Sequence, residues 1–175
     1  MTSKLLSLLT VSAALAFATA PARAANASTS IGGGVQYNHY LDDVDTDHID
    51  ENAFSYVIAL RNNTSYLLGF EIDLELQPEE LTGRDEMTYV PQAYLFLGKV
   101  IYAGAGVGIS YFDGDFADEP NYYLRAGLDL EALPGLFLDI SARYIIQDIE
   151  NISDEVTESI DGDSITLGAN LRFRI

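Results

Sequence analysis

The sequence predicts an all-β protein, an up-and-down transmembrane barrel of eight antiparallel strands. Three observations predict it. Apolar and polar residues alternate over long segments, long and short connections between these segments also alternate, and most acidic residues lie in the long connections. Alternation with a period of two indicates a strand with one apolar and one polar face. An even number of such strands is typical of barrels that cross a membrane.

The first 24 residues have the features of an export signal. Lys4 supplies a positive start, residues 5–18 are apolar apart from small Ser and Thr, and Ala22-Arg23-Ala24 forms a small-residue cleavage pattern. The apolar run is too short to span a bilayer as a helix, and a structural N-terminal helix is the alternative interpretation. We expect residues 1–24 to be a cleaved signal peptide and residues 25–175 to form the barrel domain.

Charge and composition exclude several classes of protein. Without the leader, the chain keeps 7 of its 9 basic residues and all 27 acidic ones, and it has no cysteine. Such an acidic surface repels nucleic acid, and the lack of thiols excludes disulfides, zinc–thiolate sites and cysteine nucleophiles. No segment of the mature chain is apolar for 18 residues, so a membrane location requires a closed barrel.

The clearest strand covers residues 66–77, which is longer than the roughly 5–6 residues of a globular strand and suits a tilted membrane strand of about 9–11. Its polar face carries Glu71, Asp73 and Glu75. In residues 87–97 Pro91 interrupts the ladder of hydrogen bonds; either facing is compatible there, and we assign Gln92 to the interior. The other segments with this alternation are residues 31–40, 53–61, 101–111, 121–130, 136–147 and 163–175.

The connections separate the charges. Twenty-one of the 27 acidic residues lie in or directly beside the four long connections. A soluble β-sandwich has no reason to collect its acids at one end, whereas outer-membrane barrels have long extracellular loops and tight periplasmic turns. The long connections cover about residues 41–52, 78–86, 112–120 and 148–162, and the short ones lie at 62–64, 98–99 and 131–135.

Aromatic residues gather near both ends of the expected strands, and we expect them to form girdles at the two membrane interfaces. The alternative is that aromatic residues are simply common in strands. Those near the long connections are Tyr37, Tyr40, Tyr89, Tyr111, Tyr122 and Tyr144, and those near the short turns are Tyr66, Phe96, Tyr102, Phe137 and Phe173.

The polar faces predict a charged interior. Eight strands enclose a space just wide enough for side chains to fill, and buried ions are costly unless they are paired. Arginine suits bidentate pairing with carboxylates, so we predict a salt-bridged lumen that leaves no wide pore. Hairpin register brings Asp139 near Arg172. The predicted lumen network consists of Glu71, Asp73, Glu75, Asp129 and Asp139 against Arg61, Arg125, Arg143, Arg172 and Arg174.

The competing fold is a soluble eight-stranded barrel of the lipocalin type, which has apolar residues inside and binds a small apolar ligand. Packing disfavours it. The Leu, Ile, Phe and Tyr side chains of eight long strands would overfill so small a barrel.

The glycine ladder Tyr102-Ala103-Gly104-Ala105-Gly106-Val107-Gly108 and the closing strand 165–175 resemble the small bacterial outer-membrane β-barrel superfamily, of the OmpA/OmpX type. The resemblance covers residues 31–175. It implies a location in the bacterial outer membrane, contact with membrane lipid and lipopolysaccharide, a monomer, and recognition by the barrel-assembly machinery. That machinery reads a terminal aromatic residue in the family, whereas this chain has Phe173 followed by Ile175 as its assembly signal.

Two classes of function follow. The first is a non-enzymatic barrel with a structural or interaction role, which displays its long acidic loops outside the cell. The alternative is a narrow, cation-preferring channel or porin-like protein, because interior glycines leave some room.

A lipid A-modifying barrel enzyme is the less favoured class. The chain has two histidines, His39 and His48, both in or near the first long connection. It has no G-x-S-x-G and no His-x-Ser element on a strand, so a base beside a serine nucleophile is not indicated.

The acidic loops raise the question of a metal. Asp43, Asp45 and Asp47 alternate with other residues, as does the pair in Asp113-Gly114-Asp115. Carboxylates spaced in this way can supply oxygen ligands to calcium, but the full twelve-residue binding loop with its closing glutamate is absent. We expect no cofactor, with calcium at these loops as the alternative.

Overall fold

The computed structural model describes residues 28–40, 52–65, 67–83, 86–146 and 164–175. The predicted signal peptide and the candidate calcium ligands Asp43, Asp45 and Asp47 lie outside the described residues. Within the described part, no helix is long and apolar enough to cross a membrane.

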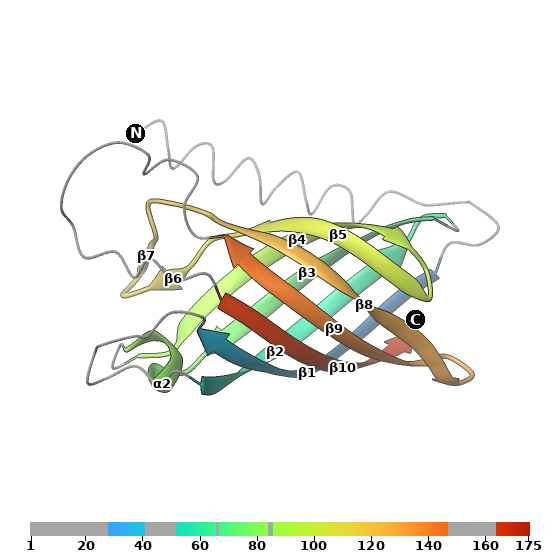
Figure 1. Cartoon of the computed structure of the whole chain (residues 1–175), viewed down its shortest axis with the longest axis horizontal. Coiled ribbons are helices and arrows are strands. Elements are labelled where there is room, and N and C mark those ends of the chain that lie inside the picture. Colours follow the sequence, from blue (N-terminus) through green and yellow to red (C-terminus); the bar gives the residue numbers. More distant parts are fainter. Residues whose placement is uncertain (1–27, 41–51, 66, 84–85, 147–163) are drawn as a thin grey trace.

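Eight long strands form a closed barrel wall (Figure 1). Each pairs antiparallel with its neighbours in chain order, and the first pairs with the last, which closes the sheet. The predicted eight-stranded antiparallel barrel is therefore confirmed. The strands are β1 (Ser28–Tyr40), β2 (Asn52–Asn63), β3 (Leu68–Gln77), β4 (Thr88–Gly98), β5 (Ile101–Gly108), β8 (Asn121–Leu133), β9 (Leu136–Ile146) and β10 (Ser164–Arg174).

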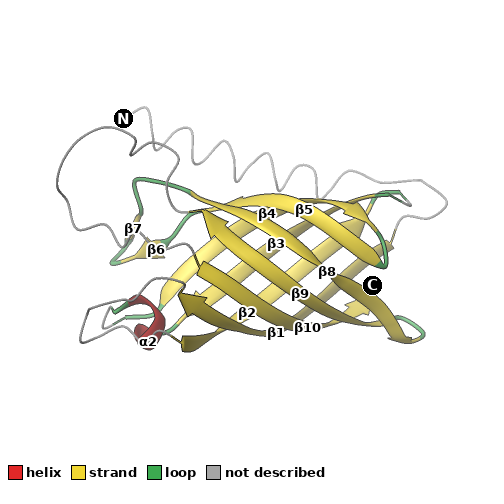
Figure 2. Ribbon diagram, viewed as in Figure 1, coloured by secondary structure: helices red, strands yellow, loops and turns green. Residues whose placement is uncertain are grey.

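Small additional elements lie at one end of the barrel, opposite the C-terminus (Figure 2). They are the short helix α2 (Glu79–Thr82) and a hairpin of β6 (Tyr111–Phe112) and β7 (Asp115–Phe116). The predicted strand 101–111 is thus too long, because β5 ends at Gly108. Asp113 and Gly114 between β6 and β7 have φ angles of 51° and 82°, which is the geometry that an Asp-Gly hairpin turn requires.

The two faces of the wall differ sharply in chemistry. On β2 the side chains of Phe54, Tyr56 and Ile58 point outward and are 57%, 54% and 52% exposed, whereas Ser55 and Val57 between them are buried. This apolar outer face suits the hydrocarbon of a bilayer. A soluble barrel of the lipocalin type would need the opposite facing, so that alternative is wrong.

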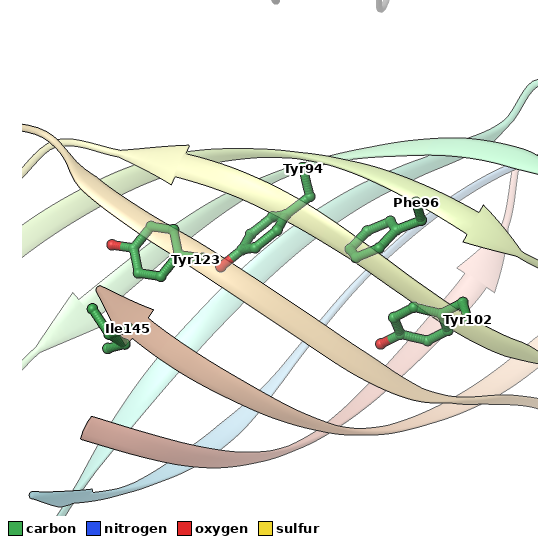
Figure 3. Packing of buried hydrophobic residues seen from close by; sticks show 5 residues of the cluster. All are labelled: Tyr94, Phe96, Tyr102, Tyr123 and Ile145. Carbon is green, nitrogen blue, oxygen red and sulfur yellow. The ribbon is translucent and has the colours of Figure 1, made fainter. Parts of the chain in front are cut away.

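The lumen also holds aromatic rings. Tyr94 and Phe96 from β4, Tyr102 from β5 and Tyr123 from β8 point inward and form a buried cluster with Ile145 from β9 (Figure 3). Tyr37, Tyr89 and Tyr122 do face outward at the long-loop end.

Three of the aromatic residues predicted in the girdle near the short turns lie in the barrel interior instead. Phe96 and Tyr102 are each 2% exposed and Phe137 is 8% exposed. The prediction was wrong for these three because alternation turns them to the same side as the lumen charges.

The glycine ladder of β5 makes room for these rings. Gly104 is paired with Phe96, and Gly106 lies between Tyr94 and Tyr123 in neighbouring strands. A Cβ atom at Gly104 would lie 2.4 Å from Cδ1 of Phe96, and one at Gly106 would lie 2.3 Å from Cδ1 of Tyr94. Glycine in a strand interior marks such close approach, so the rings lie where β5 has no side chains.

We expect Gly104→Ala to destabilise the barrel by about 1–3 kcal/mol, the usual cost of overpacking. The added methyl group meets the Phe96 ring and the carbonyl oxygen of Leu95, which would lie 2.2 Å away. Urea unfolding of the barrel in detergent, followed by far-ultraviolet circular dichroism, measures the change. The control is Ala105→Val on the outward face of the same strand, and equal stability of the two variants would contradict the packing argument.

Candidate functional site

Among the residues that the structure describes, nine charged side chains are buried in the lumen, and none of them is more than 7% exposed. They come from β2, β3, β8, β9 and β10, where alternation with a period of two aims each of them inward. These residues are Arg61, Glu71, Asp73, Glu75, Arg125, Asp129, Asp139, Arg143 and Arg172.

Glu71 is hydrogen-bonded to three of the buried guanidiniums. It accepts hydrogen bonds from Nε of Arg61, from Nη1 of Arg125 at 2.6 Å and from Nη1 of Arg172 at 3.0 Å. Its side chain has no exposed surface. Three guanidiniums from three strands, β2, β8 and β10, therefore converge on one carboxylate of β3.

Two aspartates extend this cluster toward β8 and β9. Asp139 accepts from Nη2 of Arg125 at 2.9 Å and from Nη1 of Arg61 at 3.3 Å, and its carboxylate lies 3.6 Å from Arg172. Asp129 lies 2.8 Å from Nη2 of Arg172 and 3.3 Å from Nη1 of Arg61. The expected proximity of Asp139 and Arg172 is thus present in the structure.

A second cluster lies nearer the long loops. Arg143 on β9 donates from both terminal nitrogens to the two oxygens of Glu75 on β3, at 2.8 and 3.1 Å. This is the bidentate geometry that makes arginine–carboxylate pairs strong. Glu75 also accepts from Ser55 at 2.6 Å and from Gln92. Gln92 is 3% exposed, so the structure places it inside, where it was assigned.

Aromatic rings cover the other side of the guanidiniums. The Cζ atom of Arg61 lies 4.6 Å from the ring centroid of Phe96 and 4.4 Å from that of Tyr102, and Cζ of Arg143 lies 5.1 Å from that of Tyr123. Cation–π attraction is worth about 2 kcal/mol or more when the cation is desolvated. Each of these arginines therefore lies between carboxylates and rings. The sequence predicts Phe96 and Tyr102 at the membrane interface, and its alternation gave no role to Tyr123.

A sequence signal for this aromatic wall exists. Three interior positions of β5 are the glycines Gly104, Gly106 and Gly108, and aromatic residues with the same inward parity lie opposite the first two of them on β4 and β8. A strand with so few interior side chains needs neighbours that fill its share of the lumen, because interiors are close-packed. Pairing the glycine ladder with its neighbours would have turned Tyr94 and Phe96 inward.

Arg174 does not belong to the buried network. Its side chain is 46% exposed and lies 3.1 Å from Glu131, which is 44% exposed, and its Cζ lies 5.0 Å from the ring centroid of Phe137. Alternation points Arg174 to the same side as Arg172, but the strand has reached the short-turn end there, where its backbone N–H donates to Gly135. In the described part of the chain, the buried lumen thus holds five carboxylates and four guanidiniums, not the predicted five of each.

The remaining predicted site residues lie outside the lumen. Phe173 and Ile175 of the assembly signal are 59% and 74% exposed on the outer face of the closing strand. The ring of His39 is exposed and hydrogen-bonds Asn52. In the part of the chain that the structure describes, no group of three or more His, Cys, Asp or Glu residues is arranged to hold a metal ion.

This arrangement binds charge but offers little to a substrate. The serine nearest a carboxylate, Ser55, has no exposed surface and already donates its proton to Glu75. Nucleophilic catalysis needs an accessible hydroxyl with a free base beside it. The chemistry that the site supports is therefore electrostatic cross-linking of the barrel wall.

A model of a protein family, described as outer membrane protein beta-barrel domain, matches residues 9–173 of the chain. No curated protein matches the sequence.

Three solved structures share the fold. Neisserial surface protein A has a TM-score of 0.60 at 16% identity, with 85% of this chain and 99% of that chain covered. The N-terminal β-barrel domain of Pseudomonas aeruginosa OprF has a TM-score of 0.53 at 9% identity, with 83% and 97% covered. The outer membrane protein AlkL has a TM-score of 0.50 at 15% identity, with 89% and 94% covered. At these identities, the likeness shows the fold alone.

We expect Glu71→Gln to lower the free energy of unfolding by about 3–5 kcal/mol, the cost of breaking a buried ion pair. The amide cannot balance the three guanidiniums that converge on this position. The matched control is Glu131→Gln, which removes one carboxylate from an exposed pair and leaves the unfolding midpoint in urea within error. Equal midpoints for the two variants would show that the lumen cluster adds nothing to stability.

Proposed function

Because the chain belongs to the outer membrane protein beta-barrel domain family, we propose that it is a non-enzymatic barrel of the bacterial outer membrane with a structural or interaction role. In this proposal the leader at residues 1–24 exports the chain. The ion pairs block the lumen of the barrel, and the long acidic loops face outside the cell.

One observation carries this proposal. Glu75 on β3 and Arg143 on β9 form a bidentate pair, and β3 and β9 are four strands apart in a ring of eight. They are therefore on opposite walls, so this single pair spans the lumen. The pairs from Glu71 to Arg125 and Arg172 cross the lumen in the same way, since two strands separate each partner from β3 in the ring.

The outer surface supports a role in the membrane. Outward-facing apolar side chains on all eight strands provide a belt for the hydrocarbon chains of outer-membrane lipid and lipopolysaccharide. In the closing strand, Phe173 and Ile175 are exposed on this belt, where the barrel-assembly machinery would have access to them. We propose a monomer with these partners and no nucleic acid or cofactor.

A narrow cation-preferring channel is the second candidate. The excess of one carboxylate among the buried lumen charges favours it, because a negative path attracts cations. The interior glycines of β5 do not support it, since aromatic rings occupy the space above them.

Conductance in planar bilayers tests whether the ion-paired side chains block the lumen. We expect the purified barrel to show no large, stable openings, because the Arg143–Glu75 pair and its neighbours fill the lumen. Arg143→Ala removes the longest side chain of the cross-lumen pair and leaves Glu75 without its cation, so small cation-selective openings should appear.

Arg174→Ala is the control for this measurement, because it removes a guanidinium that lies outside the lumen. It should leave the membrane current at the wild-type level. Large and stable openings of the wild-type barrel would contradict the blocked lumen and favour the channel.

A further inference from the structure

We propose that the folded barrel binds one proton on Asp73, which makes the lumen electrically neutral. The proposal starts from the charge count. Five carboxylates and four guanidiniums are buried among the described residues. An uncompensated charge in a low-dielectric interior is costly, and a buried group commonly neutralises instead. The bound proton cancels the negative excess that favours the cation channel, so the proposal agrees with the blocked lumen of the proposed function.

Asp73 has the weakest support from cations. Glu71 contacts three guanidiniums, Asp139 contacts three and Asp129 contacts two. Glu75 has a bidentate partner of its own. Asp73 forms a single ion pair in the described structure, at 3.2 Å to Nη1 of Arg125.

That single partner is shared. The same nitrogen, Nη1 of Arg125, donates to Glu71 at the shorter distance of 2.6 Å, and Nη2 of Arg125 is bound to Asp139 at 2.9 Å. The guanidinium therefore already balances other carboxylates, and Asp73 is the one left in excess.

The second oxygen of Asp73 also points to a proton. Asp73 is 2% exposed, and its Oδ1 atom has no hydrogen-bond partner in the described structure. A buried carboxylate oxygen without a donor carries the full cost of desolvation. Protonation of the carboxyl removes the charge and turns an unsatisfied acceptor into a donor.

The surroundings of Asp73 add repulsion. Glu71 and Glu75 lie two residues away on either side along β3, and residues with this spacing share one face of a strand. In the neighbouring strands, Asp73 pairs in register with Ala59 on β2 and with Gln92 on β4, neither of which carries charge. The titratable and charged groups around it are Glu71, Glu75, Arg61 on β2, Tyr94 on β4 and Arg125 on β8.

A proton fits this position better than an alkali cation. A metal cation needs several oxygen ligands around it, and the described residues contain no group of three acidic or histidine side chains arranged for one. A proton needs one oxygen and almost no space.

Infrared spectroscopy of the mature barrel in an ester-free detergent at neutral pH tests the proposal directly. We expect the carbonyl band of a protonated carboxylic acid, which shifts in heavy water and is lost in Asp73→Asn. The control Glu131→Gln, an exposed carboxylate outside the lumen, should keep the band. Absence of the band from the wild type overturns the proposal, as does its persistence in Asp73→Asn. Failure of Asp73→Asn to fold also counts against the proposal, because a neutral amide should replace a neutral acid without loss.

Stability gives an independent readout. A neutral amide replaces a neutral acid in Asp73→Asn, so the urea midpoint should stay within error of the wild type. The matched substitution Asp139→Asn removes a charged partner of three guanidiniums and should lower the midpoint clearly. Equal losses in the two variants overturn the proposal.

The salt dependence distinguishes a proton from an alkali cation. Sodium chloride and choline chloride at equal ionic strength should give the same midpoint. A midpoint that requires sodium assigns the missing charge to an alkali cation and overturns the proton.

Discussion

The convergence of Arg61, Arg125 and Arg172 on Glu71 is the interaction on which the rest of the structure depends. An eight-stranded barrel leaves space only for side chains in its interior, so each inward residue must find its partner across the lumen. Ion pairs between β3 and the strands β8, β9 and β10 therefore tie opposite walls together. In the described part of the chain, most of the largest fully buried side chains are polar or charged, and these groups must satisfy one another.

Glycine and aromatic residues divide the same space on the other side of the lumen. β5 contributes Gly104, Gly106 and Gly108 as interior residues, and rings from β4 and β8 lie over that strand. The rings face Arg61 and Arg143, so these guanidiniums lie between carboxylates and aromatic rings. The carboxylates and the rings both favour the cation, which explains how Arg61, Arg125 and Arg143 remain buried.

Much of this architecture follows from local pattern. The alternation along residues 66–77 predicted both the strand and the inward facing of Glu71, Asp73 and Glu75. The Asp-Gly pair before β7 is also a turn signal, although only a loop was predicted there. The inward or outward facing of side chains was harder to predict in residues 87–97. Val90 and Phe96 have no polar atoms and Tyr94 has only a hydroxyl, so their chemistry does not distinguish a lumen from a lipid surface. The glycine partners of Tyr94 and Phe96 lie on β5.

The sequence by itself determined the number of long strands, their antiparallel order, the apolar outer face and nine of the ten predicted lumen charges, because alternation of side chains is a property of each strand alone. Only the tertiary structure decided which carboxylate meets which guanidinium, that Arg174 pairs with Glu131 outside the lumen, and that five acids face four bases within it. These outcomes depend on the stagger between strands and on where the wall ends. Stagger is set by the closure of the whole barrel, so no single segment of sequence contains it.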